Sequence, residues 1–105
     1  MDTSDQRNAR PWGNFVVLDS AETYKVKRIE VLPGHRLSYQ RHQGRSEHWM
    51  IVEGSAKVTI DDSQLNLSVG DVIDIAIGSA HRIGNSGKDS LVFIEIQRGK
   101  FLSED

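Results

Sequence analysis

Residues 34–54 read GHRLSYQRHQGRSEHWMIVEG. Two runs of β-type residues, Arg36–His42 and Glu47–Glu53, lie on either side of a turn signal at Gln43-Gly44. Neither run shows the spacing of three to four residues that marks one face of a helix. The stretch therefore predicts two short strands joined by a tight turn and bounded by glycine at each end.

The same pattern of short apolar runs continues in both directions from this stretch. Strands are predicted at Phe15–Asp19, Lys25–Leu32, Arg36–His42, Glu47–Glu53, Ala56–Ile60, Gln64–Leu67, Asp71–Ile75, His81–Gly84 and Leu91–Gln97. Gly, Pro, Asn and Asp separate the runs, and Asp61-Asp62 marks a hairpin tip. At most one turn of helix is expected, at Ser20–Thr23. Many short, closely spaced strands predict an all-β protein, either an antiparallel sandwich or a barrel.

Length and composition restrict the class of protein further. A chain of 105 residues holds one domain, predicted over residues 10–105, behind a polar, flexible N-terminal arm at residues 1–9. A net charge of −2 without a basic patch argues against a nucleic-acid partner. The absence of cysteine excludes disulfides and thiolate chemistry. Since no apolar run approaches the roughly 18 residues of a membrane span, a cytoplasmic protein without a membrane partner is expected.

Candidate metal ligands gather around the first stretch. Residues two apart in a strand share a face, so Gln40 and His42 lie together, and the turn brings Glu47 onto the same interior surface. His81, just after a glycine turn, is available as a fourth ligand from another strand. His48 directly follows Glu47 and should face the opposite way, so we predict that it is not a ligand. A single His or Glu in a β domain is more often an ordinary surface residue.

The spacing of these residues between glycines resembles the two motifs of the cupin superfamily. The first motif is matched by Gly34, Gln40, His42, Glu47 and Gly54, with Gln40 where most cupins place a histidine. The second motif is matched by Gly70, Gly78, His81 and Asn85, with Ala76 in place of the usual proline. The resemblance implies a double-stranded β-helix, a conical barrel open at one end. In that fold the four ligand positions meet inside around one divalent metal.

A closer resemblance covers nearly the whole chain. The strings RPWG at Arg10–Gly13, LSYQRH at Leu37–His42, RSEHW at Arg45–Trp49 and IEIQ at Ile94–Gln97 resemble the type II mannose-6-phosphate isomerase domain. That domain is often fused behind a mannose-1-phosphate guanylyltransferase. The resemblance implies metal-assisted interconversion of mannose 6-phosphate and fructose 6-phosphate. Because the chain stops at Asp105, before the arginine-containing tail of the family, impaired turnover of the sugar phosphate is expected.

The types of the candidate ligands limit which metals could bind, and further polar residues are candidates for catalysis and substrate binding. Zinc is the first expectation, and manganese, iron, cobalt or nickel also suit a set of nitrogen and oxygen donors. Glu95, facing inward near the end of a strand, is the candidate catalytic base. An alternative of equal weight is that Glu95 only pairs with an arginine or donates a hydrogen bond to a metal ligand. Lys27, Ser38 and Arg45 are candidate contacts to a sugar or sugar phosphate, with salt bridges or simple packing as the open alternatives.

Two other functions and an assembly state stay open at this point. The chain could be a non-catalytic metal- and carbohydrate-binding cupin, or a metal-dependent dioxygenase. Gln40 in place of histidine argues against the dioxygenase, since iron sites of that kind are richer in nitrogen. A small core predicts a homodimer, formed through a sheet face that includes Ile29, Met50 and Val52 or through an exchanged N-terminal strand that includes Trp12.

Overall fold

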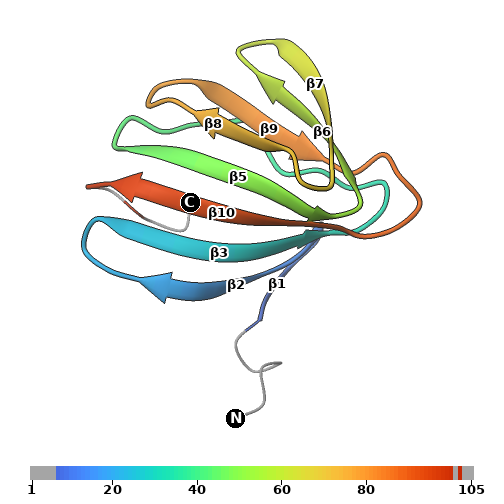
Figure 1. Ribbon diagram of the computed structural model, residues 1–105, viewed down its shortest axis with the longest axis horizontal. Coiled ribbons are helices and arrows are strands. Elements are labelled where there is room, and N and C mark those ends of the chain that lie inside the picture. Colours follow the sequence, from blue (N-terminus) through green and yellow to red (C-terminus); the bar gives the residue numbers. More distant parts are fainter. Residues whose placement is uncertain (1–6, 101, 103–105) are drawn as a thin grey trace.

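A computed structural model describes residues 7–100 and 102 and shows ten strands and no helix among them (Figure 1). The strands are β1 (Asn8–Arg10), β2 (Gly13–Ser20), β3 (Tyr24–Val31), β4 (Gln40–Arg41), β5 (Arg45–Glu53), β6 (Ser55–Ile60), β7 (Ser63–Ser68), β8 (Val72–Ile75), β9 (Ala80–Gly84) and β10 (Leu91–Gly99). They form a six-stranded sheet in the order β1-β2-β3-β10-β5-β8 and a four-stranded sheet in the order β4-β9-β6-β7. In this part of the chain no helix has the length and apolar character of a membrane span.

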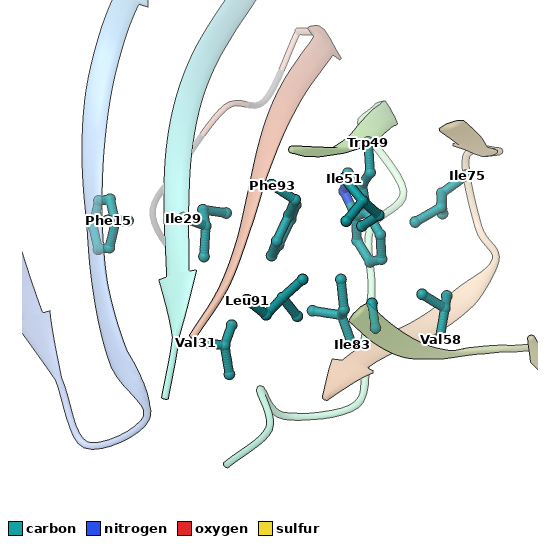
Figure 2. Packing of buried hydrophobic residues seen from close by; sticks show 11 residues of the cluster. Phe15, Ile29, Val31, Trp49, Ile51, Val58, Ile75, Ile83, Leu91 and Phe93 are labelled. Carbon is teal, nitrogen blue, oxygen red and sulfur yellow. The ribbon is translucent and has the colours of Figure 1, made fainter. Parts of the chain in front are cut away.

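The hydrophobic core lies between the two sheets. Figure 2 shows the buried side chains gathered in the space between the strands of the larger sheet and those of the smaller one. The cluster contains Phe15, Ile29, Val31, Trp49, Ile51, Ala56, Val58, Ile75, Ile83, Leu91 and Phe93. Phe93 on β10 is fully buried, and its ring lies 5.3 Å from that of Trp49. Burial of such apolar surface is the main favourable contribution to the stability of the barrel.

The register of three neighbouring strands places polar residues beside this core. On the central strand β10, Glu95 pairs with Lys27 of β3 on one side and with Trp49 of β5 on the other. Gln97 pairs with Glu47 in the next inward-facing row. Directly paired residues point to the same side of a sheet. The sequence pattern that buries Leu91 and Phe93 therefore also carries charged and amide side chains into the interior, toward one end of the barrel.

The strand predicted at Arg36–His42 is wrong in extent and in its connection. Only Gln40 and Arg41 form a strand, and Arg36 makes a single bridge to Gly84. In addition, β4 belongs to the four-stranded sheet and β5 to the six-stranded sheet, so Gln43-Gly44 joins the two sheets and closes no hairpin. Residues 37–39 between these two points belong to no strand, although Leu37 N donates a 3.0 Å hydrogen bond to Ile83 O of β9.

The N-terminal segment also differs from the prediction. Asn8 and Ala9, expected in a flexible arm, pair with β2 in strand β1, whereas residues 1–6 lie outside the described part of the chain. Trp12 holds the turn between β1 and β2 in place. Its side chain packs against the core, and its carbonyl oxygen accepts a 2.9 Å hydrogen bond from Leu32 N. The next residue, Gly13, cannot carry a side chain, since a Cβ there would lie 2.0 Å from Glu30 O.

Smaller predictions have mixed outcomes. The segment Ser20–Thr23 holds no helical turn; instead β2 and β3 are joined by a turn closed by a bond from Ala21 N to Tyr24 O. Asp61 and Asp62 form the predicted hairpin tip, with φ values of 46° and 71°. Ile29 is only 4 % exposed and belongs to the core, so it is not available for a dimer face. Met50 and Val52 are exposed at 41 % and 37 %, and the homodimer itself stays a prediction.

Candidate metal centre

A cavity of about 200 Å³ lies at the polar end of the barrel. All the site residues predicted from the sequence line it except His42: Lys27, Ser38, Gln40, Arg45, Glu47, His81 and Glu95. His42 is half-buried and faces the same cluster, with its ring 5.1 Å from that of His81. Four strands that are distant in sequence, β3, β4, β5 and β10, thus contribute to one cavity together with β9.

His42, Glu47 and His81 form the centre of this cluster. One potential ligand atom from each lies within 4.8 Å of the others. Glu47 Oε2 is 3.6 Å from His42 Nε2, and Glu47 Oε1 is 3.9 Å from His81 Nε2. Ligands bound about 2.0–2.2 Å from one ion stand roughly 3–4.4 Å apart. Two imidazoles and a carboxylate at this spacing fit one divalent metal ion.

Gln40 lies beside this triad. Its Oε1 atom is 3.1 Å from His42 Nε2, while its Nε2 donates a 2.8 Å hydrogen bond to Ser38 Oγ. The Ser38 hydroxyl therefore directs the amide oxygen, which is the atom able to bind a metal, toward the histidine. This arrangement offers a fourth donor at the position predicted for it. Ser38 is itself exposed at the rim of the cavity.

Neighbouring groups hold two of the ligands in place. His81 Nδ1 donates to Ser79 O at 3.0 Å, which holds the ring with Nε2 on the side of Glu47, 3.9 Å from its Oε1 atom. Trp49 Nε1 donates to Glu47 Oε1 at 2.9 Å, and Arg45 Nε donates to Glu47 Oε2 at 3.0 Å. The Arg45 guanidinium also lies 3.0 Å from His42 Nε2. Of the alternatives for Arg45, the salt bridge with Glu47 is therefore present in this structure.

The two buried carboxyl groups of the cavity have pKa values shifted in opposite directions. Burial acts to raise the pKa of Glu47, but His81, Arg45 and the hydrogen bond from Trp49 together lower it below its ordinary value. Burial, followed by the negative charge of Glu47, raises the pKa of Glu95 to about 8. Gln97 donates a hydrogen bond to Glu95 Oε1. The surroundings thus favour the carboxylate form of Glu47, which could bind a metal ion, and they keep the proton on Glu95 to a higher pH than in an ordinary glutamic acid.

The remaining predicted residues divide into those inside and outside the cavity. Lys27 is buried, with its Nζ 4.6 Å from the centroid of the Phe15 ring. His48 points away from the cluster, as predicted, and its Nδ1 lies 2.6 Å from Asp74 Oδ1 on the partly exposed outer face. The hydrogen bond from Trp49 to Glu47 was not predicted, although the strand position of Trp49, two residues after Glu47, was a usable signal. It also missed Arg10, whose place in the cavity depends on the unpredicted strand β1.

Two antiparallel sheets that enclose a His, Glu and His cluster define a cupin barrel, and the predicted fold is confirmed. The solved cupin domain of Schizosaccharomyces pombe Cnp3 has a TM-score of 0.79 and 17 % sequence identity to this chain. That match covers 82 % of this chain and 64 % of the solved one. Within the superfamily, the chain belongs to the family described as mannose-6-phosphate isomerase C-terminal, which matches residues 2–105.

Curated relatives support the same family. The alginate biosynthesis protein AlgA of Pseudomonas aeruginosa is 46 % identical over 96 residues, which is 91 % of this chain and 20 % of that protein. A mannose-1-phosphate guanylyltransferase of Escherichia coli K12 matches with the same identity and coverage. The chain therefore spans about a fifth of the length of these relatives. The family match over residues 2–105 agrees with the resemblance found in the sequence.

Proposed function

We propose that this chain is a metal-dependent aldose–ketose isomerase domain that interconverts mannose 6-phosphate and fructose 6-phosphate. The observation that carries the proposal is the pairing of a metal-ligand triad with a buried proton-exchanging carboxyl group in one cavity. His42, Glu47 and His81 face one another within 4.8 Å, and Glu95 is in electrostatic contact with Glu47. Membership of the isomerase family supports this assignment.

The chemistry divides between the metal and the residues of the chain. His42, Glu47 and His81, with Gln40 beside them, would hold the ion, which supplies an electrophile for the two adjacent oxygens of the sugar. As a carboxylate, Glu95 removes the proton from C2 of the aldose. As the acid, it then returns a proton to C1. The hydroxyl proton passes from O2 to O1 in the same conversion, so the carbonyl group moves from C1 to C2 and no atom is gained or lost. The Gln97 amide holds the Glu95 carboxyl group in place through its hydrogen bond.

Zinc is the metal we propose first. Two imidazoles and one carboxylate form a common catalytic zinc set, which keeps a further position for water or substrate. Manganese, iron, cobalt and nickel accept the same donors, so the donor set alone does not decide between them. The substrate would reach the ion through the cavity, whose polar lining suits hydroxyl groups.

The test is to strip the protein with a chelator, restore one metal at a time, and follow fructose 6-phosphate production in a coupled assay. We expect activity with at least one metal, loss of activity in His81→Ala, and retention in His48→Ala. The second variant is a matched control, because His48 lies on the outer face and pairs with Asp74. A protein that binds metal stoichiometrically yet produces no fructose 6-phosphate would instead be a non-catalytic metal- and carbohydrate-binding cupin, and the proposal would be wrong.

A further inference from the structure

A second hollow, of about 420 Å³, lies on the outer face of the four-stranded sheet. Val58 of β6 and Ile83 of β9 are buried between the two sheets, so the residues next to them along each strand point outward. Outward residues of these strands and of β7, with residues of the adjoining loops, line the hollow: Gly34, Arg36, Lys57, Thr59, Gln64, Arg82, Gly84, Asn85 and Ser86. Among the described residues, only Arg82 also borders the interior cavity, so the hollow is a separate site.

The charged side chains of this hollow are all basic. Arg36, Lys57 and Arg82 line it, and no aspartate or glutamate of the described residues does. The Arg82 guanidinium lies 5.5 Å from the Tyr39 ring centroid. Within residues 7–100 and 102, the exposed side chains of Arg36 and Lys57 take part in no salt bridge or hydrogen bond. Three cations without a neighbouring carboxylate attract an anion, even in a chain with a net charge of −2.

Gly84 forms the floor of the hollow between two of these cations. It bridges to Arg36 on one side and pairs with Lys57 on the other. A Cβ at Gly84 would lie 3.1 Å from Arg36 Cβ, so the glycine keeps this space open. Neighbouring strands are about 4.8 Å apart, so the backbones at Arg36 and Lys57 stand roughly 10 Å apart. Long side chains from both sides can meet an anion above Gly84, and Arg82, two residues earlier on the same face, adds a third cation.

We propose that Arg36, Lys57 and Arg82 bind a diphosphate group in this hollow, either free or as part of a larger molecule. A phosphate monoester carries only about −1.5 to −2 charges at neutral pH, which leaves part of three positive charges unbalanced. A diphosphate carries more charge on a longer group, so it suits three separated cations better. The Thr59 hydroxyl and the Gln64 amide add neutral donors to the lining. Neither this site nor the proposed isomerase centre depends on the other.

The test locates binding by NMR, residue by residue. Inorganic diphosphate is titrated into the full, isotope-labelled chain at low salt, with inorganic phosphate and a nucleoside diphosphate in parallel titrations. No metal is added, because diphosphate itself chelates divalent ions. The variants are Arg36→Gln, Lys57→Gln and Lys57→Arg. Arg98→Gln is the matched control, because Arg98 is exposed on β10 and lines neither cavity.

We expect diphosphate to shift the amide signals of β6 and β9 around Lys57 and Gly84, and to bind more tightly than phosphate. Arg36→Gln and Lys57→Gln should each weaken diphosphate binding about tenfold, as loss of a charge-assisted contact does. Lys57→Arg and Arg98→Gln should keep the affinity of the parent protein. Equal affinity for the inorganic and the nucleoside diphosphate would identify the free anion as sufficient, whereas tighter binding of the nucleoside diphosphate would identify a larger ligand.

Three results would overturn the inference. The first is equal diphosphate affinity in the Lys57→Gln and Arg98→Gln variants. The second is a set of shifts confined to residues of the interior cavity, such as Glu95. The third is the absence of binding by the parent protein at millimolar diphosphate. Because the titration measures no turnover, failure of the isomerase assay leaves these outcomes unchanged and rejects the proposed function alone.

Discussion

Replacing Glu95 with glutamine should remove most of the pH dependence of stability in the metal-free protein. Glutamine is isosteric with glutamic acid and can imitate its protonated form, because it offers a carbonyl oxygen to Gln97 and an N–H group to Glu47. The substitution therefore keeps the shape and the hydrogen bonds of the buried side chain. It removes the proton exchange and the charge.

The expected size follows from the pKa of Glu95, which burial and the Glu47 charge raise from 4.5 to about 8. In the folded protein the Glu95 carboxyl group keeps its proton up to about pH 8, whereas in the unfolded chain the same group loses its proton near pH 4.5. Folding thus binds a proton between these two pH values. The stability that Glu95 contributes is therefore fully present below pH 4.5 and is lost as the pH rises through 8. The loss has a slope of about 1.4 kcal/mol per pH unit.

The assay is thermal unfolding in a chelator between pH 5 and pH 8, followed by tryptophan fluorescence. The parent protein should lose about 6 °C in Tm per pH unit from this group. The Glu95→Gln variant should be as stable as the parent at pH 5 and clearly more stable at pH 8. The two proteins differ in this side chain alone, so the difference between their profiles reports the loss of the Glu95 carboxyl group. Two profiles that run parallel over the whole range would refute the reasoning.

Two further substitutions test the supports of the site and of the fold. Trp49→Phe removes the 2.9 Å hydrogen bond to Glu47 Oε1, so it should lower the free energy of unfolding by about 2 kcal/mol and weaken metal binding. Chemical denaturation measures the first effect and metal titration the second, and unchanged values in both would contradict this expectation. Gly54→Ala should destabilise more strongly than Gly34→Ala in the same denaturation experiment. Both glycines have positive φ, but a Cβ at Gly54 would lie 2.6 Å from Ser90 O, while none of the surrounding atoms is within 4 Å at Gly34.

The strands were predictable where a run rich in apolar and β-branched residues lies between turn residues. The run Leu91–Gln97 corresponds to β10, which extends two residues further. Strand β1 was not predictable, since Asn8–Arg10 has no apolar pattern and pairs only because Trp12 anchors the turn beside it. The same holds for the change of sheet at Gln43-Gly44. A turn signal marks where the chain bends, but it does not say which sheet receives the next strand.

The ligand positions were predictable for a different reason. Strand parity and the glycine framing place Gln40, His42, Glu47 and His81 on inward positions, and small shifts at strand ends do not change parity. Residues whose contribution depends on long-range packing were missed. The strand position of Trp49, two residues after Glu47, indicated that the two side chains share a face, but the hydrogen bond between them follows from the burial of Glu47, which the sequence alone does not give.

The most direct test of the account is to crystallise the protein with zinc and locate the ion by anomalous diffraction. We expect one anomalous peak in the barrel cavity. It should lie about 2.0–2.3 Å from Nε2 of both His42 and His81 and from a carboxylate oxygen of Glu47. Gln40 Oε1 should face the same peak and complete the donor set. A peak on the outer face at His48 and Asp74, or an empty cavity at saturating zinc, would contradict the metal centre and the isomerase chemistry that depends on it.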